Sequence, residues 1–277
     1  MYKQYYQDYF TKCFQELKAT ENVQIKKLFK TIRKDFKDDD FDCVIQPFVS
    51  VLINDIIPYV EKEDIEDTII GELDEFIKAT KYMRKAYVLD IHLIGQKQNC
   101  WRTLQIPATL VLSELCYAIM SVFCCDGGHL FSIEYKKKEY YCDAYSSDFQ
   151  DVEYVSDEII PCFNLRKGSH MIMTYDFGDN FMFDIRVKEV KDFHYRLSYN
   201  DIQLLDGKGY GIWEDDHYLM ELYHNDPKRF KDVCEENGYD EEYFPIDEEF
   251  DLALYNEEII NDMNRYINIY ERNDIQF

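Results

Sequence analysis

Apolar residues recur at helical spacing through the first third of the chain. One stripe runs through residues 6–17, a second through 25–36, a third through 44–52 and a fourth through 65–77. Side chains spaced three and four residues apart share one side of an amphipathic helix. Pro58 ends or kinks the third of these helices. We therefore predict a helical N-terminal region over residues 1–83, with about three to five helices.

After Arg84 the apolar residues recur every second position. Residues 87–93 alternate apolar with mixed positions, which is typical of a strand, and residues 101–106 read as its partner in a hairpin. Thr109 is suited to cap a following helix, whose apolar stripe includes Leu112 and Leu115. Gly127 and Gly128 end that helix before a further strand over 129–135.

A second hairpin is predicted over residues 171–187. Residues 171–175 and 181–187 form its strands, and the turn 176–180 contains Gly178, which we expect to adopt a conformation closed to other residues. From His217 onward the pattern is helical again. Residues 84–277 therefore predict an α+β domain, a β-grasp-like mixed sheet packed on a helix, with the N-terminal helical region added to it.

The net charge indicates which classes of partner the protein is expected to bind. The chain has 31 basic and 55 acidic residues and a net charge of −24, and residues 214–258 alone hold 17 acids and 3 bases, or −14. A field of this sign repels nucleic acids, which are bound through Lys and Arg. Two basic clusters, at Lys26–Lys34 and Lys136–Lys138, are short and flanked by acids. We expect no direct binding of DNA or RNA.

The compartment and cofactor predictions rest on missing signals. No apolar run approaches eighteen residues, and the nine cysteines include no C-x-x-C pair. These features predict a protein without a membrane span, with reduced thiols and a cytoplasmic location. The phosphate-loop, dinucleotide, nucleophile-elbow and H-E-x-x-H motifs are also missing from the sequence, so no cofactor or motif-bound metal is predicted.

Five segments carry a resemblance to a known family. They are the motifs YVLDIHL at 87–93, CWRTLQIP at 100–107, a Thr-Leu pair at 109–110 with Leu112 and Leu115, GHLF at 128–131, and YDFGD at 175–179. In order and spacing they resemble the plasmid ORF-three-like family, over about residues 84–277. The family label also includes an insertion-element passenger of TnpR type, which implies a bacterial, mobile-element-associated protein of no settled activity.

Three positions depart from the family pattern. Cys116 stands where the family usually has His, and Phe181 and Phe183 stand where it usually has Trp and His. A polar site built on those histidines would be damaged here. Resolvase chemistry is not expected, because the chain lacks a nucleophilic Ser among arginines and a basic DNA-binding module.

One constellation of polar residues remains as a candidate site. It consists of Arg102, His129, Asp176, Asp179, Glu214, Asp215 and His217, beside Trp101. Carboxylates near a histidine bind a divalent metal or act as acid and base. The alternative is architectural, with both aspartates capping the turn, His129 starting a strand, and Arg102 pairing with an acid across the hairpin.

Two functions from different classes follow. The first is a non-catalytic, acidic module for protein–protein interaction, in which the acidic segment steers a basic protein partner. The second is a metal-dependent or acid/base hydrolase that uses Asp176, Asp179, His129 and Glu214. Saturable binding of Mn²⁺ or Zn²⁺ separates the two.

Overall fold

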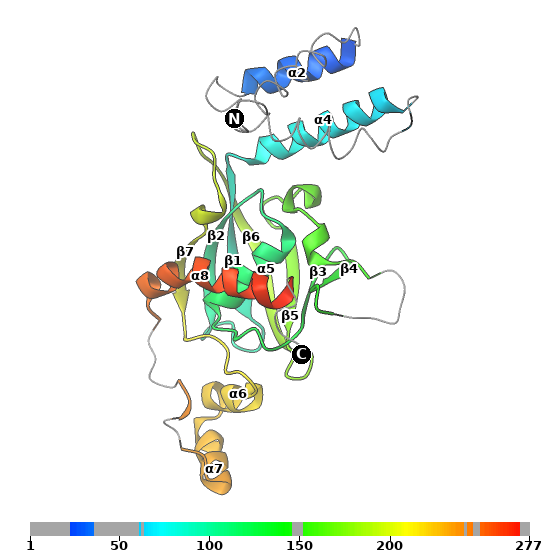
Figure 1. Ribbon diagram of the computed structural model, residues 1–277. Helices are drawn as coiled ribbons and strands as arrows, with labels where there is room; N and C mark the ends of the chain where they lie inside the picture. Colours follow the sequence, from blue (N-terminus) through cyan, green and yellow to red (C-terminus); the bar gives the residue numbers. More distant parts are fainter. Residues whose placement is uncertain are drawn as a thin grey trace, which may run out of the picture. The chain divides into compact units, whose positions relative to one another are not determined.

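The computed structural model describes residues 23–35, 61, 64–145, 152–240, 243–245 and 250–271 (Figure 1). The chain divides into two compact units, residues 1–81 and 82–277. In the first unit, helices α2 (Val23–Asp35) and α4 (Ile65–Tyr82) bury Ile25, Leu73 and Ile77. These two helices match the second and fourth predicted stripes, and the first and third stripes lie outside the described residues.

The second unit is built on a seven-stranded sheet with the strand order β4-β3-β5-β6-β1-β2-β7. All six pairings between neighbouring strands are antiparallel. The strands are β1 (Lys85–Leu93), β2 (Trp101–Pro107), β3 (Phe131–Tyr135), β4 (Lys138–Tyr141), β5 (His170–Tyr175), β6 (Phe181–Asp192) and β7 (Gln203–Lys208).

Both predicted hairpins are confirmed. Leu89 pairs with Leu104 in β1 and β2, and Met173 pairs with Phe183 in β5 and β6. The prediction of a mixed sheet is wrong for the described strands, and the structure does not show a β-grasp arrangement. The physical reason for three of the six pairings is that short connections join β1 to β2, β3 to β4 and β5 to β6, whereas parallel neighbours need a longer crossover.

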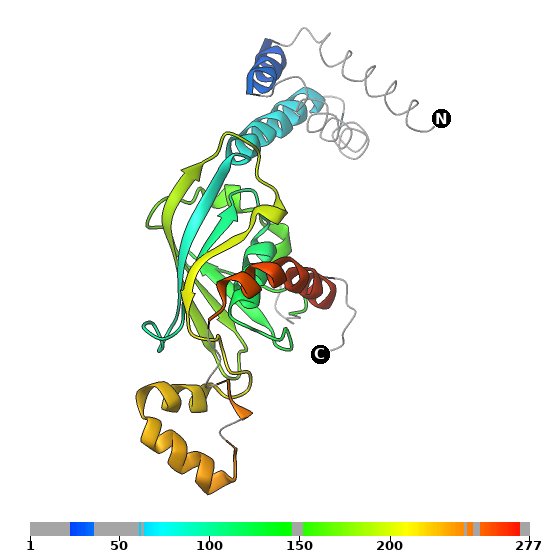
Figure 2. The same ribbon diagram turned by 90° about the vertical axis from the view of Figure 1, so that its left-hand side faces the viewer.

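Two helices, α5 (Leu112–Val122) and α8 (Leu252–Tyr270), cover one face of the sheet (Figure 2). Helix α5 is buried on nearly all sides, as expected for a helix between the sheet and α8. The predicted cap Thr109 lies outside the helix, which begins after Val111. There the Val111 N–H donates to Glu114 Oε2 at 2.9 Å.

The core predicted between the sheet and α5 is confirmed. Leu112 and Leu115 of the predicted helix stripe are buried, together with seven further apolar residues, and Trp101 is half-buried. The nine are Leu104, Ile106, Leu112, Leu115, Ile119, Phe123, Phe181, Ile185 and Val187.

Shorter elements complete the second unit. Helices α6 (His217–Asn225) and α7 (Pro227–Asn237) follow β7 and pack against each other. Trp213 stacks on Phe244 with ring centroids 5.0 Å apart and also contacts Phe230 of α7. Single 3₁₀ turns occupy Val155–Asp157, Ile160–Phe163 and Tyr199–Asp201. Within the described residues, no helix is both long and apolar enough to span a bilayer.

Candidate functional site

Arg102 lies apart from the other candidate residues, inside the protein. Its side chain is fully buried and donates hydrogen bonds to the carbonyls of Val122 at 2.6 Å, Lys208 at 2.6 Å and Tyr210 at 2.6 Å. No ion pair to a carboxylate is present in the described parts of the chain, so the predicted pair across the hairpin is wrong. Arg102 is therefore a residue of the core and not of the candidate site.

His129 lies in the loop between α5 and β3, and α8 holds this loop in place. The Tyr270 hydroxyl donates to the carbonyl of Gly127 at 3.1 Å and to that of His129 at 2.5 Å. The Tyr266 hydroxyl donates to the carbonyl of Cys125 at 2.5 Å. The imidazole is therefore positioned by a helix that lies more than a hundred residues later in the chain.

Three carboxylates from two further loops surround the His129 ring. Asp176 Oδ2 lies 3.6 Å from Nδ1, while Asp215 Oδ1 lies 3.4 Å and Glu214 Oε2 lies 3.8 Å from Nε2. Asp176 follows β5 directly, and Glu214 and Asp215 precede α6. The structure thus brings together His129, Asp176, Glu214 and Asp215. Asp179, which the hydrolase interpretation of the sequence also uses, contacts His217 instead.

A tyrosine hydroxyl connects this group to a fourth carboxylate, Asp126. Tyr175 Oη lies 3.0 Å from Asp126 Oδ1 and 3.1 Å from Glu214 Oε1, and it accepts a hydrogen bond from the Gly127 N–H at 3.1 Å. The Asp126 N–H in turn donates to Glu214 Oε1 at 2.6 Å. Glu214 is therefore held through one oxygen, and its other oxygen, Oε2, points toward His129 and lacks a hydrogen-bond partner in the described structure.

Burial and neighbouring charge make Glu214 an unusual acid. Burial, together with the nearby Asp126 carboxylate, raises its pKa to about 7 despite the lowering effects of the Asp126 N–H, the Tyr175 hydroxyl and His129. An acid with a pKa near 7 exchanges its proton at neutral pH, as general acid–base catalysis requires. Burial also raises the pKa of Asp216, beside Asp179 and Asp215.

Two of the carboxylates sit on strained backbone. Asp176 has φ of 56° and Asp215 has φ of 59°, in the left-handed region that non-glycine residues rarely adopt. Such strain concentrates at functional sites. The prediction for Gly178 is wrong, because Gly178 is not among the residues with positive φ and Asp176 takes that conformation instead. The predicted acceptor is confirmed, with the Gly178 N–H donating to Asp176 Oδ1 at 2.8 Å.

Asp179 and His217 form a second pair, which joins the turn to α6. The His217 N–H donates to Asp179 Oδ2 at 3.2 Å, and His217 Nδ1 lies 2.6 Å from the Asp179 carbonyl oxygen. The His217 ring also packs against Phe181, with centroids 4.6 Å apart. These contacts give Asp179 and His217 an architectural role at the start of α6.

We call the residues around this imidazole the His129 group, which consists of His129, Tyr175, Asp126, Asp176, Glu214 and Asp215. The group has the composition of a divalent-cation site. Asp126, His129 and Glu214 place ligand atoms within 4.8 Å of one another, and so do His129, Asp176 and Asp215. No Lys or Arg in the described structure forms an ion pair with these carboxylates. Imidazole and carboxylate ligands suit Zn²⁺, Mn²⁺ and related ions.

Sequence reasoning missed Asp126 and Tyr175 as members of this group. Both lie in or beside motifs that it singled out, since Asp126 precedes Gly127 and Tyr175 begins the YDFGD block. The three departures from the family pattern, Cys116, Phe181 and Phe183, are buried in the apolar core. None of them belongs to the His129 group.

Comparisons with known proteins bear on the family. The chain resembles the solved structure of a protein of unknown function from Methanosarcina mazei Go1, with 22% identity and a TM-score of 0.47. The match covers 61% of this chain and 95% of that one. No curated protein matches the chain. The family described as plasmid pRiA4b ORF-3-like protein matches residues 85–248, which is more than half of the chain and includes the whole His129 group, and the chain belongs to this family.

Proposed function

We propose that the domain binds a divalent cation between His129 and the surrounding carboxylates and uses it in hydrolysis. The observation that carries the proposal is the convergence of Asp126, Asp176, Glu214 and Asp215 on one imidazole. Four carboxylates so close together repel one another unless protons or a cation compensate them. Asp176 adds to this cost, because only 7% of its surface is exposed.

The roles in hydrolysis follow from the positions of the groups. His129 and the surrounding carboxylates would hold the cation, which would supply a bound water activated as a nucleophile. Glu214, whose Oε2 faces His129 without a hydrogen-bond partner in the described structure, would accept the proton of that water. Asp215, whose side chain is 78% exposed, lies at the entrance to the group. Tyr175 and the Asp126 N–H hold Glu214 in place.

Calorimetric titration with Mn²⁺ and Zn²⁺ tests cation binding. We expect one saturable site in the wild-type protein and at least about tenfold weaker binding in Asp176→Asn and Glu214→Gln, since each loses a charged ligand. Asn is well suited to position 176 because it tolerates positive φ. Asp179→Asn is the matched control, because its side-chain oxygen still accepts the His217 N–H.

Two results would contradict this proposal. One is the absence of saturable binding of either ion to the wild-type protein, and the other is equal weakening by Asp179→Asn. Hydrolysis is tested separately with phosphoester, carboxylic ester and peptide substrates, with and without the ion. If the protein binds the cation but turns over none of these substrates, the hydrolase proposal is contradicted and a cation-binding function remains.

A second proposal is an interaction surface on the acidic segment 214–258. The specific observation is that three large aromatic side chains there are exposed, Tyr218 at 61%, Tyr239 at 52% and Tyr243 at 88%. Exposed tyrosines within a strongly negative field suit a basic protein segment, since tyrosine faces bind Lys and Arg and the field steers them.

Fluorescence anisotropy with a labelled Arg- and Lys-rich peptide tests this surface. We expect binding that weakens with salt and that falls at least about fivefold in the double variant Tyr218→Ala/Tyr243→Ala. Tyr195→Ala is the control, because Tyr195 is 46% exposed but lies outside the acidic segment. Equal binding by the double variant would leave the acidic charge as a solubilising feature.

A further inference from the structure

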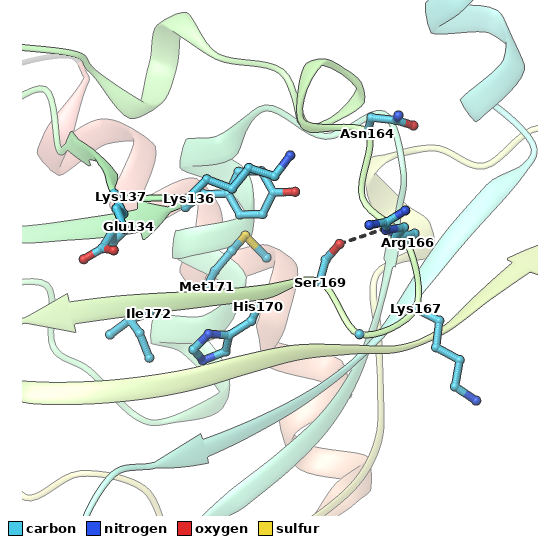
Figure 3. A pocket seen from close by; sticks show the side chains of 12 residues that line it. Glu134, Lys136, Lys137, Asn164, Arg166, Lys167, Ser169, His170, Met171 and Ile172 are labelled. Atoms are coloured by element: carbon cyan, nitrogen blue, oxygen red, sulfur yellow. Dashed lines mark hydrogen bonds between the residues drawn. The ribbon is translucent and has the colours of Figure 1, made fainter.

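A cavity of about 700 Å³ opens beside the β3–β4 turn and the start of β5 (Figure 3). Two segments form most of its lining, residues 134–137 around the turn and residues 164–172 leading into β5. In Figure 3, Lys136 and Arg166 lie on two sides of the cavity, with Met171 and Ser169 between them. The volume is within the range that accommodates small organic ligands.

The charge of this cavity is opposite to that of the protein. Its lining contains Lys136, Lys137, Arg166 and Lys167, and Glu134 is the only acid that lines it in the described structure. The four cationic side chains have no ion pair with any described residue, although the whole chain has a net charge of −24. In a protein with so many carboxylates, four unpaired cations around one hollow indicate a site for an anion.

The backbone on both sides of the cavity is fixed. Lys136 and Lys137 have φ of 52° and 69° and connect β3 to β4 as a two-residue turn of type I′, which requires positive φ at both positions. Lys136 Nζ lies 4.8 Å from the centroid of the Tyr135 ring. Lysine is a poor choice for such a turn, which Asn-Gly fits best. The turn thus keeps two cations at a conformational cost.

The opposite wall is tied down by hydrogen bonds. The Arg166 N–H donates to Ser169 Oγ at 3.0 Å, and the Ser169 N–H donates to the Arg166 carbonyl at 2.8 Å. The Val187 N–H of β6 donates to the Ser169 carbonyl at 2.9 Å. The guanidinium of Arg166 therefore extends from an ordered loop.

We propose that this cavity binds a small, multiply charged phosphate ester. The Arg166 guanidinium offers a planar fork of donors that matches phosphate oxygens, and Lys136 and Lys137 add point charges. Several cations against one acid favour a ligand with more than one negative charge over a monocarboxylate. Ile172, which is half-buried in the lining, supplies apolar surface for the remainder of the ligand.

The cavity is separate from the His129 group. In the pairing of β3 with β5, Tyr135 lies opposite Met171 at the cavity end, and Phe131 lies opposite Tyr175 at the other end, next to Asp176. The two ends are four residues apart, or roughly 13 Å at the usual rise of a strand. The inference is therefore independent of the proposed cation site.

Calorimetric titration with inorganic pyrophosphate and with a nucleoside diphosphate tests the proposal, in the presence of a chelator so that no metal bridges the ligand to His129. We expect saturable binding by the wild-type protein and at least tenfold weaker binding by Arg166→Gln and by the double variant Lys136→Asn/Lys137→Gly. The double variant installs the pair that a type I′ turn prefers, so its melting temperature should be equal to or above that of the wild type. Pyrophosphate binding equal to that of the diphosphate shows that the phosphates alone are recognised, and tighter binding of the diphosphate shows that the apolar surface contributes.

Lys228→Gln is the matched control, since Lys228 is exposed on α7 and distant in sequence from the cavity. Its affinity for pyrophosphate should equal that of the wild type. The proposal is overturned if neither probe binds the wild-type protein, or if the double variant binds as tightly as the wild type. It is also overturned if only a duplex oligonucleotide binds, since that would assign the basic residues to nucleic acid.

Discussion

Replacing Arg102 by Ala is expected to lower the free energy of unfolding by about 3–5 kcal/mol. The guanidinium donates to carbonyls of β2, of α5 and of the 208–210 segment, including Trp101 at 3.0 Å and Gly209 at 2.9 Å. It also lies about 5 Å from the ring centroids of Phe123, Phe250 and Tyr255. The variant leaves these carbonyls unsatisfied around an empty volume.

Chemical denaturation measures this change, and Arg102→Lys shows what the fork itself contributes. Lysine keeps the charge but cannot reproduce the planar set of donors, so we expect most of the loss to remain. The control is Arg229→Ala, which removes an exposed contact with Glu236 and should change the stability by about 0.5 kcal/mol or less. A loss as small for Arg102→Ala would contradict the role of Arg102 in the core.

Replacing Glu214 by Gln is expected to stabilise the protein at pH 8 by about 2 kcal/mol and to have little effect near pH 4.5. Burial raises the pKa of this acid to about 7 in the folded state. Between pH 4.5 and 7 the folded protein therefore retains a proton that the unfolded chain releases, and the stability falls as the pH rises through this window. The expected gain of about 2 kcal/mol is less than the full pKa shift would give, because the Glu214 side chain remains 19% exposed and water weakens the effect.

The measurement is the free energy of unfolding of both proteins from pH 4.5 to 8, in a chelating buffer. Glu189→Gln serves as the control, since Glu189 lies exposed on β6. Adding the cation should abolish the advantage of the Gln variant, because a bound cation stabilises the ionised carboxylate. A Gln variant that is less stable than the wild type at pH 8 would show that Glu214 is not strained by its charge.

Local pattern predicted the hairpins, because alternation in Tyr87–Leu93 and Phe181–Val187 is a property of neighbouring residues. The pattern failed at β7, where the strand Gln203–Lys208 has one buried residue, Leu204, and ends in Gly207 and Lys208. The order of the strands in the sheet could not be predicted from the local pattern either. It depends on β1 pairing with β6, about a hundred residues later.

The candidate site was also predicted only in part. His129, Asp176, Glu214 and Asp215 were grouped by their motifs, and the structure brings these four together. Arg102 was grouped with them wrongly, because a sequence does not reveal whether a guanidinium in a strand faces carboxylates or carbonyls. The burial that raises the pKa of Glu214 arises from packing and was also not predictable.

The hold of α8 on the His129 loop has a consequence for the order of folding. The hydroxyls of Tyr266 and Tyr270 reach back to loop 125–129, across more than a hundred and thirty residues. Contacts between such distant segments form late, because a long loop must close first. During synthesis the sheet has all its strands once residue 208 has left the ribosome, but the loop that bears His129 still lacks its anchors. The strands of the sheet are therefore synthesised before the site can form, and α8 later supplies the anchors of the loop that bears His129.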